Sequence, residues 1–248
     1  MPKRAERSSS YMIQGQEVTL PVIVRDASSG VATYLVDSAA ARRLLPGPEL
    51  DVIEPWPGRT LLSIAVIDYK DNDLGNYDEV SITLYVRERS APSGIPYLGA
   101  LLNFMRGRVS TYIRHLPVNQ SFTCEAGRTI WGFPKTVEEI DFRYESSRVT
   151  CKLVSNGQHV LTLSLPRGGR RSLPDAQMTT YSYIEGAPHK TCFTQSGEGV
   201  GFKLGGGRIE LGEHPIALQL CELGLPKRPL MTVWIEKMQG RFSAAEKL

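Results

Sequence analysis

The sequence predicts a mainly β protein of the α+β class, with antiparallel strands closed or nearly closed into a barrel and a few peripheral helices. Most apolar runs are short, rich in β-branched residues and separated by Gly, Pro, Asn or Asp. Several runs alternate apolar and polar residues, as half-buried strands do. Few segments combine a helical pattern with end signals. Closure into a barrel removes exposed strand edges and leaves a cavity for a ligand.

The expected strands are spread along the whole chain. Residues 61–68 form a continuous apolar run, which fits a strand buried on both faces. Residues 77–87 alternate, and one face of that strand carries Val80, Ile82, Leu84 and Val86. Asn156-Gly157 predicts a tight hairpin, because both residues tolerate positive φ. Further strands are expected at 17–25, 31–36, 149–154, 159–165, 179–184, 191–194, 208–211 and 230–238.

We expect three helices, at residues 38–45, 97–106 and 215–223. Pro46 ends the first, and Gly224 is a C-cap for the third. No repeat or low-complexity linker divides the chain, so we expect one domain over residues 1–248, with 1–12 as a flexible tail.

Charge and hydropathy exclude several classes of partner. A net charge of +3 is too small to indicate nucleic-acid binding. No stretch approaches the ~20 apolar residues of a membrane helix, and no secretory signal is present. The four cysteines lack CxxC spacing, so we expect reduced thiols and no structural zinc. We therefore expect a cytoplasmic protein with neither a nucleic-acid nor a membrane partner.

The segment CEAGRTIWGFPKT, residues 124–136, carries the strongest chemical signal. Lys135 follows Trp131, Phe133 and Pro134. An amine held among aromatic rings loses the hydration of its charged form, and a neutral amine can attack a ketone. The alternative is a lysine that extends to the surface beside two core aromatics.

Carboxylates crowd residues 68–79, DYKDNDLGNYDE. The spacing departs from a calcium-binding loop, so a polar hairpin is the better interpretation and we expect no metal. Glu79 differs because it opens the alternating strand. If it faces a barrel interior, its carboxylate can hold a cationic amine or transfer protons.

Three segments together resemble the acetoacetate decarboxylase-like superfamily. They are GRTIWGFPK at 127–135, LGNYDE at 74–79 and AAARRLLPGPEL at 39–50. The resemblance implies a cone-shaped barrel, a homo-oligomer and a small keto acid substrate, with no cofactor. It implies that Lys135 is the Schiff-base lysine and Glu79 the cavity glutamate. Arg128 matches a positioning residue, and we expect it to bind substrate together with Trp131 and Phe133.

The chain departs from the decarboxylase pattern at three places. Thr136 stands where the decarboxylases have a second lysine. Leu62 or Ser63 stands near the position of a further glutamate. Ala27 stands where the decarboxylases have an arginine in their N-terminal strands, and Arg25 of this chain is only nearby.

Three functions remain open from the sequence. The first is decarboxylation of acetoacetate or a related β-keto acid through a Schiff base on Lys135. The second is an aldolase-dehydratase that uses a pyruvate-derived enamine. The third is a barrel that binds a small ligand without turning it over.

Overall fold

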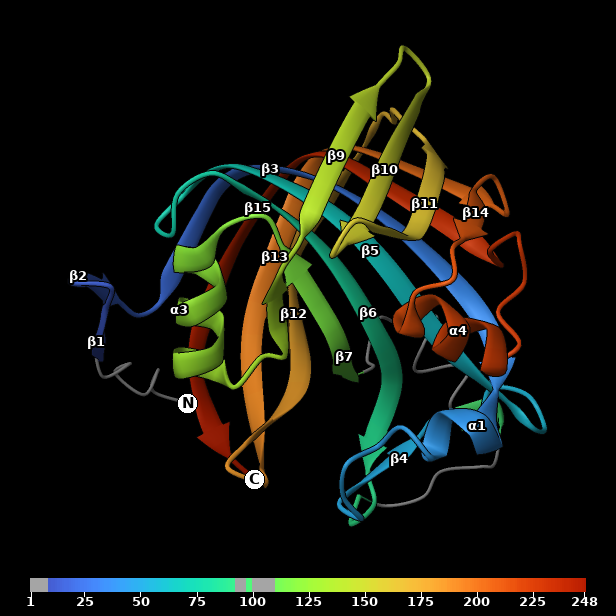
Figure 1. Ribbon diagram of the computed structural model, residues 1–248, viewed down its shortest axis with the longest axis horizontal. Coiled ribbons are helices and arrows are strands. Elements are labelled where there is room, and N and C mark those ends of the chain that lie inside the picture. The colour runs from blue at the N-terminus through green and yellow to red at the C-terminus, as the bar shows by residue number, and fades with distance from the viewer. Residues whose placement is uncertain (1–8, 92–96, 100–109) are drawn as a thin grey trace.

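The computed structural model describes residues 9–91, 97–99 and 110–248. Seven long, curved strands close into a barrel in the order β6-β5-β3-β15-β13-β12-β7, and pairing of β7 with β6 completes the ring (Figure 1). The expected barrel is therefore confirmed. The strands are β3 (Val22–Asp37), β5 (Arg59–Asn72), β6 (Tyr77–Glu88), β7 (Ser110–Val118), β12 (Arg171–Ile184), β13 (Ala187–Leu204) and β15 (Met231–Lys247).

The barrel is mixed rather than purely antiparallel. β7 runs parallel to β12, with which its residues 110–112 pair. Its residues 116–118 also pair in parallel with β8 (Lys135–Val137). A closed ring with an odd number of strands cannot alternate direction at every neighbour, so at least one pair must be parallel. Between β7 and β8 the chain crosses over through α3 (Ser121–Trp131), the helical connection that parallel neighbours require.

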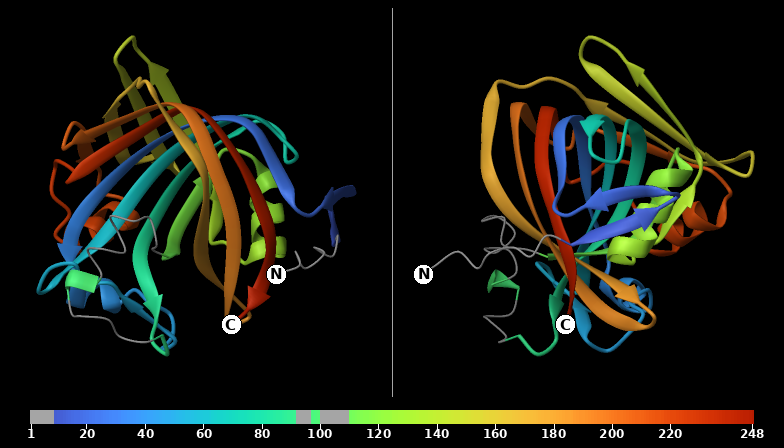
Figure 2. Two further views of the ribbon diagram at one scale, coloured as in Figure 1. Left: turned by 180° about the vertical axis from the view of Figure 1, so that it is seen from behind. Right: turned by 90° about the vertical axis from the view of Figure 1, so that its left-hand side faces the viewer.

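A second sheet covers one outer face of the barrel. It has the order β14-β11-β10-β9 and consists of β9 (Glu139–Tyr144), β10 (Arg148–Ser155), β11 (Gln158–Pro166) and β14 (Arg208–Leu211). Figure 2 shows this sheet standing beside the barrel rather than within its ring. The predicted Asn156-Gly157 hairpin joins β10 to β11, with both residues at positive φ.

The space between the two sheets holds the larger hydrophobic cluster, which we call the outer core. The even-numbered residues of β6 contribute their apolar side chains to it, and β10 and β11 face them from the other sheet. Burial of this surface drives the two sheets together, at about 25 cal/mol per Å² of apolar area. The apolar face of β6 therefore points out of the barrel, which leaves the opposite face to line the interior. The β6 members are Val80, Ile82, Leu84 and Val86.

Two of the three expected helices are observed. α1 (Ser38–Arg42) begins after Asp37, whose side chain caps Ala40 N at 2.7 Å. α4 (Pro215–Glu222) starts at its proline and is followed by Gly224 at φ 70°. Both pack on the outer core. Most of the helix expected at 97–106 lies outside the described residues.

The sequence analysis missed α3. Its N-cap, Gln120, makes no side-chain cap hydrogen bond, and the helix contains Gly127 and β-branched residues. Such a segment has weak intrinsic helix propensity. Burial of one face against the barrel stabilises it instead, as tertiary packing does for most protein helices.

The other differences from the predicted elements are small. Residues 10–12, expected in the tail, belong to β1 (Ser10–Ile13), which pairs with β2 (Gln16–Thr19). Residues 68–72, expected in the polar hairpin, extend β5. A short β4 (Leu50–Val52) pairs with the end of β6. Within the described ranges, no helix has the length and apolarity needed to cross a membrane.

Candidate active site

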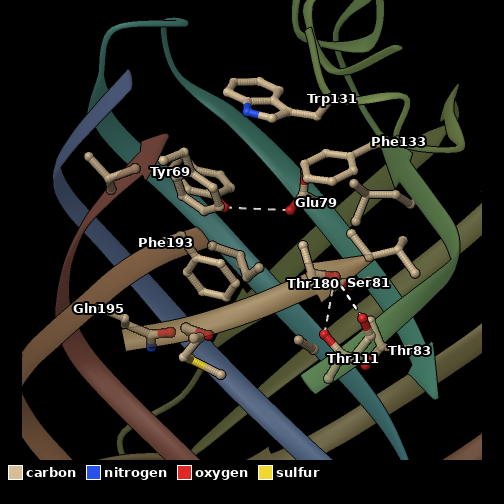
Figure 3. Close-up of a pocket in the computed structure, with 18 of the residues that line it drawn as sticks. Tyr69, Glu79, Ser81, Thr83, Thr111, Trp131, Phe133, Thr180, Phe193 and Gln195 are labelled. Atoms are coloured by element: carbon tan, nitrogen blue, oxygen red, sulfur yellow. Dashed lines mark hydrogen bonds between the residues drawn. The ribbon is translucent and has the colours of Figure 1, made fainter. Parts of the chain in front are cut away.

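The barrel encloses a cavity of about 190 Å³. Strand β6 lines it with the alternate set of side chains, opposite to the outer core: Glu79, Ser81, Thr83 and Tyr85. Aromatic and aliphatic side chains cover one end, and hydroxyl groups gather at the other (Figure 3). The interior of this barrel is thus a partly polar chamber, whereas its main hydrophobic core lies outside the ring.

Lys135 and Glu79 meet in the wall of this cavity. Lys135 Nζ lies 2.8 Å from Glu79 Oε2, and the two side chains are only 3% and 8% exposed. The Tyr77 ring lies under the amine, 4.9 Å from centroid to Nζ. The amine thus contacts a carboxylate and the face of an aromatic ring, both of which interact favourably with a cation.

The end of α3 directs Lys135 into the cavity. The helix stops at Gly132, which adopts φ 63° and donates its N–H back to Arg128 O and Gly127 O. Three residues later β8 begins at Lys135, which pairs in parallel with Leu116. Since alternate strand residues point to opposite faces, Lys135 points inward and Thr136 does not line the cavity.

Two glycines make this geometry sterically possible. A Cβ on Gly127 would lie 2.5 Å from Lys135 Cδ, so the lysine side chain passes directly over the helix at this point. A Cβ on Gly132 would lie 2.4 Å from Ile184 Cγ1 and 2.9 Å from Tyr183 O. The sequence analysis assigned no packing role to Gly127, because such a role depends on where α3 lies.

Arg128 does not line the cavity. Its side chain is exposed, and its Nε donates a hydrogen bond to Lys135 O at 2.7 Å. The guanidinium therefore holds the backbone of the lysine. Arg128 thus contacts the backbone of the lysine from outside the cavity lining.

Trp131 and Phe133 both line the cavity that Lys135 also lines. Their rings stack with centroids 5.6 Å apart, and Trp131 Nε1 donates to Ser243 O at 2.8 Å. Ser182 Oγ donates to Trp131 O at 2.5 Å. These bonds fix the indole in the wall, so the two aromatics form a rigid apolar surface next to Lys135.

Two tyrosines complete the surroundings of Glu79. Tyr69 OH donates to Glu79 Oε1 at 3.5 Å, and the Tyr69 and Tyr77 rings stack at 4.4 Å. Burial, followed by the negative charge of Glu79, raises the pKa of Tyr69 well above its usual value. Tyr69 therefore stays a phenol and can donate a hydrogen bond to the carboxylate or to a ligand. Neither tyrosine was predicted as a site residue.

The departures from the decarboxylase pattern have clear positions. Ser63 points into the cavity, whereas Leu62 belongs to the outer core. Arg25 forms ion pairs with Asp71 and Asp73 at 2.8 and 2.5 Å, and it does not line the cavity. Among the described lining residues, Lys135 and Glu79 are therefore the only charged ones.

The described part of the chain contains no group of three or more His, Cys, Asp or Glu side chains placed to hold a metal ion. The chemistry available at the site is that of an amine, a carboxylate and phenol or alcohol hydroxyls. A buried amine next to a carboxylate is one arrangement by which proteins activate a lysine as a nucleophile.

Comparisons with solved structures agree with this architecture. An acetoacetate decarboxylase from Legionella pneumophila superposes with a TM-score of 0.67 at 14% identity, covering 100% of this chain and 91% of its own. The enduracididine biosynthesis enzyme MppR, complexed with pyruvate, gives 0.58 at 17%, covering 92% and 90%. An acetoacetate decarboxylase-like enzyme from Sphingomonas wittichii RW1 gives 0.55 at 15%, covering 98% and 100%. At these identities the similarity concerns the fold.

Comparison of the sequence with curated proteins gave no match. The family model described as acetoacetate decarboxylase (ADC), in contrast, matches residues 11–238. The match covers most of the chain, including the segments that supply Glu79 and Lys135. The chain therefore belongs to the acetoacetate decarboxylase family.

Proposed function

We propose that this protein is a Schiff-base enzyme that decarboxylates acetoacetate or a related β-keto acid, with Lys135 as the nucleophile. The observation that carries the proposal is the buried contact of 2.8 Å between Lys135 Nζ and Glu79 Oε2 in the wall of the barrel cavity. A buried lysine without a chemical role would be costly to keep, because its charged form loses hydration.

The reaction follows from the chemistry of an amine. Glu79 takes a proton from the ammonium group, and the neutral amine attacks the ketone of the substrate. Loss of water from the adduct gives a protonated imine. The bond to the carboxylate then breaks, carbon dioxide leaves, and the electron pair moves into the imine to form an enamine. Protonation of the enamine carbon and hydrolysis release the ketone and free Lys135.

The apolar wall beside the amine favours this outcome. Phe133, Leu116 and Ile113 line the cavity there and offer no charge partner to a carboxylate. A carboxylate placed against such a surface loses hydration, whereas neutral carbon dioxide does not. The imine itself accepts the electrons, so the proposed reaction requires no metal or organic cofactor.

A second candidate keeps the Schiff base and changes the outcome. Ser63 stands near the position where the decarboxylase pattern has a glutamate, and MppR, complexed with the condensation product of pyruvate and imidazole 4-carboxaldehyde, has the same fold. The same site could then form an enamine from pyruvate that adds to an aldehyde and loses water. Tyr69 would supply a proton donor for the departing hydroxyl group.

Borohydride trapping tests both candidates. The protein is mixed with acetoacetate or with pyruvate, reduced, digested and weighed by mass spectrometry. We expect a reduced adduct on the peptide that contains Lys135, with acetoacetate trapping better and releasing carbon dioxide. A better adduct with pyruvate, together with consumption of an aldehyde, would favour the second candidate. An adduct that persists in Lys135→Ala would contradict the nucleophile assignment.

Absence of any adduct would instead support the third alternative, a barrel that only binds its ligand. We also propose a cytoplasmic homo-oligomer, on the strength of the family resemblance. Sedimentation velocity of the full chain tests the oligomer, and a monomer at micromolar concentration would contradict it.

A further inference from the structure

The cavity extends well beyond the reacting amine. Along β6, alternate residues from Glu79 onward face the interior: Ser81, Thr83 and Tyr85. With a rise of about 3.3 Å per residue, Ser81 lies roughly 7 Å and Thr83 roughly 13 Å along the strand from Glu79. A substrate whose carbonyl carbon is at Lys135 therefore has room to extend toward these hydroxyls. Acetoacetate is too short to reach the more distant one.

Hydroxyl groups from several strands converge at this far end, which we call the hydroxyl end. Thr111 Oγ1 donates to Thr180 Oγ1 at 3.1 Å, and Thr180 Oγ1 contacts Thr111 O at 3.3 Å. Figure 3 shows these two threonines next to Ser81 and Thr83, away from Trp131 and Phe133. Deeper in the barrel, Ser63 Oγ lies 2.8 Å from Tyr85 OH and 3.2 Å from Thr33 Oγ1.

Not all of this polar surface is satisfied by the protein itself. Within the described chain, the side chains of Ser81, Thr83 and Gln195 make no hydrogen bond, although each lines the cavity. Ser81 is only 9% exposed. Thr83 and Gln195 are partly exposed, whereas Ser81 is buried. A buried hydroxyl without a partner is costly, so Ser81 requires water or a ligand group, and Thr83 and Gln195 can bind the same group.

The charge of the cavity limits what that ligand group can be. Of the described lining residues only Lys135 and Glu79 are charged, and both stand at the opposite end. A second carboxylate or an ammonium group at the hydroxyl end would be desolvated without a counter-charge. A purely apolar chain would leave the free hydroxyls unpaired. An uncharged polar group satisfies both conditions.

We propose that the hydroxyl end recognises an uncharged polar substituent, a hydroxyl or a carboxamide, at the end of a keto acid remote from its reacting carbonyl. Ser81 and Thr83 are its specificity-determining residues. The inference rests on the proposed function for the position of the carbonyl at Lys135. It assigns to this protein a substrate longer and more polar than acetoacetate.

A pair of matched substrates tests this inference. One is a straight-chain β-keto acid that ends in a methyl group, and the other carries a hydroxyl in place of that methyl. We expect kcat/KM to favour the hydroxyl compound by about tenfold, the worth of roughly one net hydrogen bond. The double variant Ser81→Ala/Thr83→Val should lose most of this preference. Equal rates, or a preference for the methyl compound in the natural chain, would overturn the inference.

Thr191→Val serves as the matched control. Thr191 is fully buried on β13, its hydroxyl has no hydrogen-bond partner among the described residues, and it does not line the cavity. The control should therefore retain the preference of the natural chain. Retention of the preference by the double variant as well would remove the role of Ser81 and Thr83.

Binding measured separately from chemistry distinguishes the two proposals. Calorimetric titration of both compounds into Lys135→Ala gives a binding preference that does not depend on adduct formation. A preference for the hydroxyl compound without a borohydride adduct would overturn the Schiff-base function and keep the specificity inference. Adducts that form equally well with both compounds would keep the Schiff-base function and overturn the specificity inference. No binding of either compound at millimolar concentration would overturn both.

Discussion

Lys135 Nζ and Glu79 Oε2 lie 2.8 Å apart although they come from strands that do not pair with each other. β7 lies between their strands, and it pairs with β6 through Glu79 and Val118 and with β8 through Leu116 and Lys135. The register of β7 on both sides thus sets the distance between amine and carboxylate. Changes at Glu79, Gly127 and Arg128 test this arrangement and its supports.

Replacement of Glu79 by Gln removes the proton acceptor but keeps the size of the side chain. We expect the rate of adduct formation and turnover to fall by about 10²–10⁴-fold, the usual contribution of a general base. Stopped-flow or trapping kinetics measure the effect. Glu139→Gln, at an exposed position of β9, is the control and should react at the natural rate. Undiminished turnover in Glu79→Gln would exclude Glu79 from proton transfer.

Replacement of Gly127 by Ala tests the steric path of the lysine. The new Cβ would lie 2.5 Å from Lys135 Cδ, so the lysine must move away from its position. We expect turnover to fall by about 10²-fold, as displacements of around 1 Å can cause. Helix propensity alone would stabilise the variant by about 1 kcal/mol, which partly offsets the clash in a thermal melt.

Thr129→Ala, at an exposed position of the same helix, is the control for Gly127→Ala. It should show ordinary turnover with an equal or higher Tm. If Gly127→Ala turned over substrate at the natural rate, the close approach of the lysine to α3 would not matter for activity.

Replacement of Arg128 by Ala removes the hydrogen bond from its Nε to Lys135 O. Since the guanidinium does not line the cavity, we expect kcat to fall by about tenfold while KM changes little. Arg128→Lys should restore only part of kcat, because an ammonium group lacks the planar geometry of the guanidinium. A change confined to KM would instead place Arg128 in direct contact with substrate.

The pH dependence of stability should report on Asp78. Burial, followed by the nearby charges of Asp68 and Asp141, raises the pKa of Asp78 from 3.8 to about 6. The folded protein therefore binds the proton more tightly than the unfolded chain. This contribution to the free energy of unfolding is present below about pH 4 and is lost as pH rises through about 6.

Asp78→Asn should remove this loss of stability at high pH, because the amide does not ionise. Its amide oxygen can still accept the bond from Asn119 Nδ2, which Asp78 Oδ2 accepts at 2.8 Å. After allowance for solvent screening, we expect a gain of about 1 kcal/mol at pH 7 and little change near pH 4. Urea denaturation at the two pH values measures it. Lower stability of the variant at pH 7 would show that the carboxylate is stabilising.

Much of the fold could be predicted from local patterns. The alternation of 77–87, the apolar run of 61–68 and the Asn156-Gly157 turn each correspond to observed elements, because strand and turn preferences act over a few residues. α3 could not be predicted in this way. Its weak propensity is overridden by burial against strands that are distant in the sequence.

The local sequence around Lys135 and Glu79, and the resemblance of their segments to one family, were enough to predict both as site residues. The alternation of residues 77–87 likewise predicted one apolar and one polar face for β6. Neither pattern could show that the apolar face packs outside the ring, under the second sheet, while the polar face lines the cavity. Only the tertiary structure decided this, and it likewise placed Arg128 outside the cavity lining and Gly127 beneath the lysine. The physical reason is that side-chain alternation separates two faces of a strand, whereas the burial of each face depends on the elements that come to cover it.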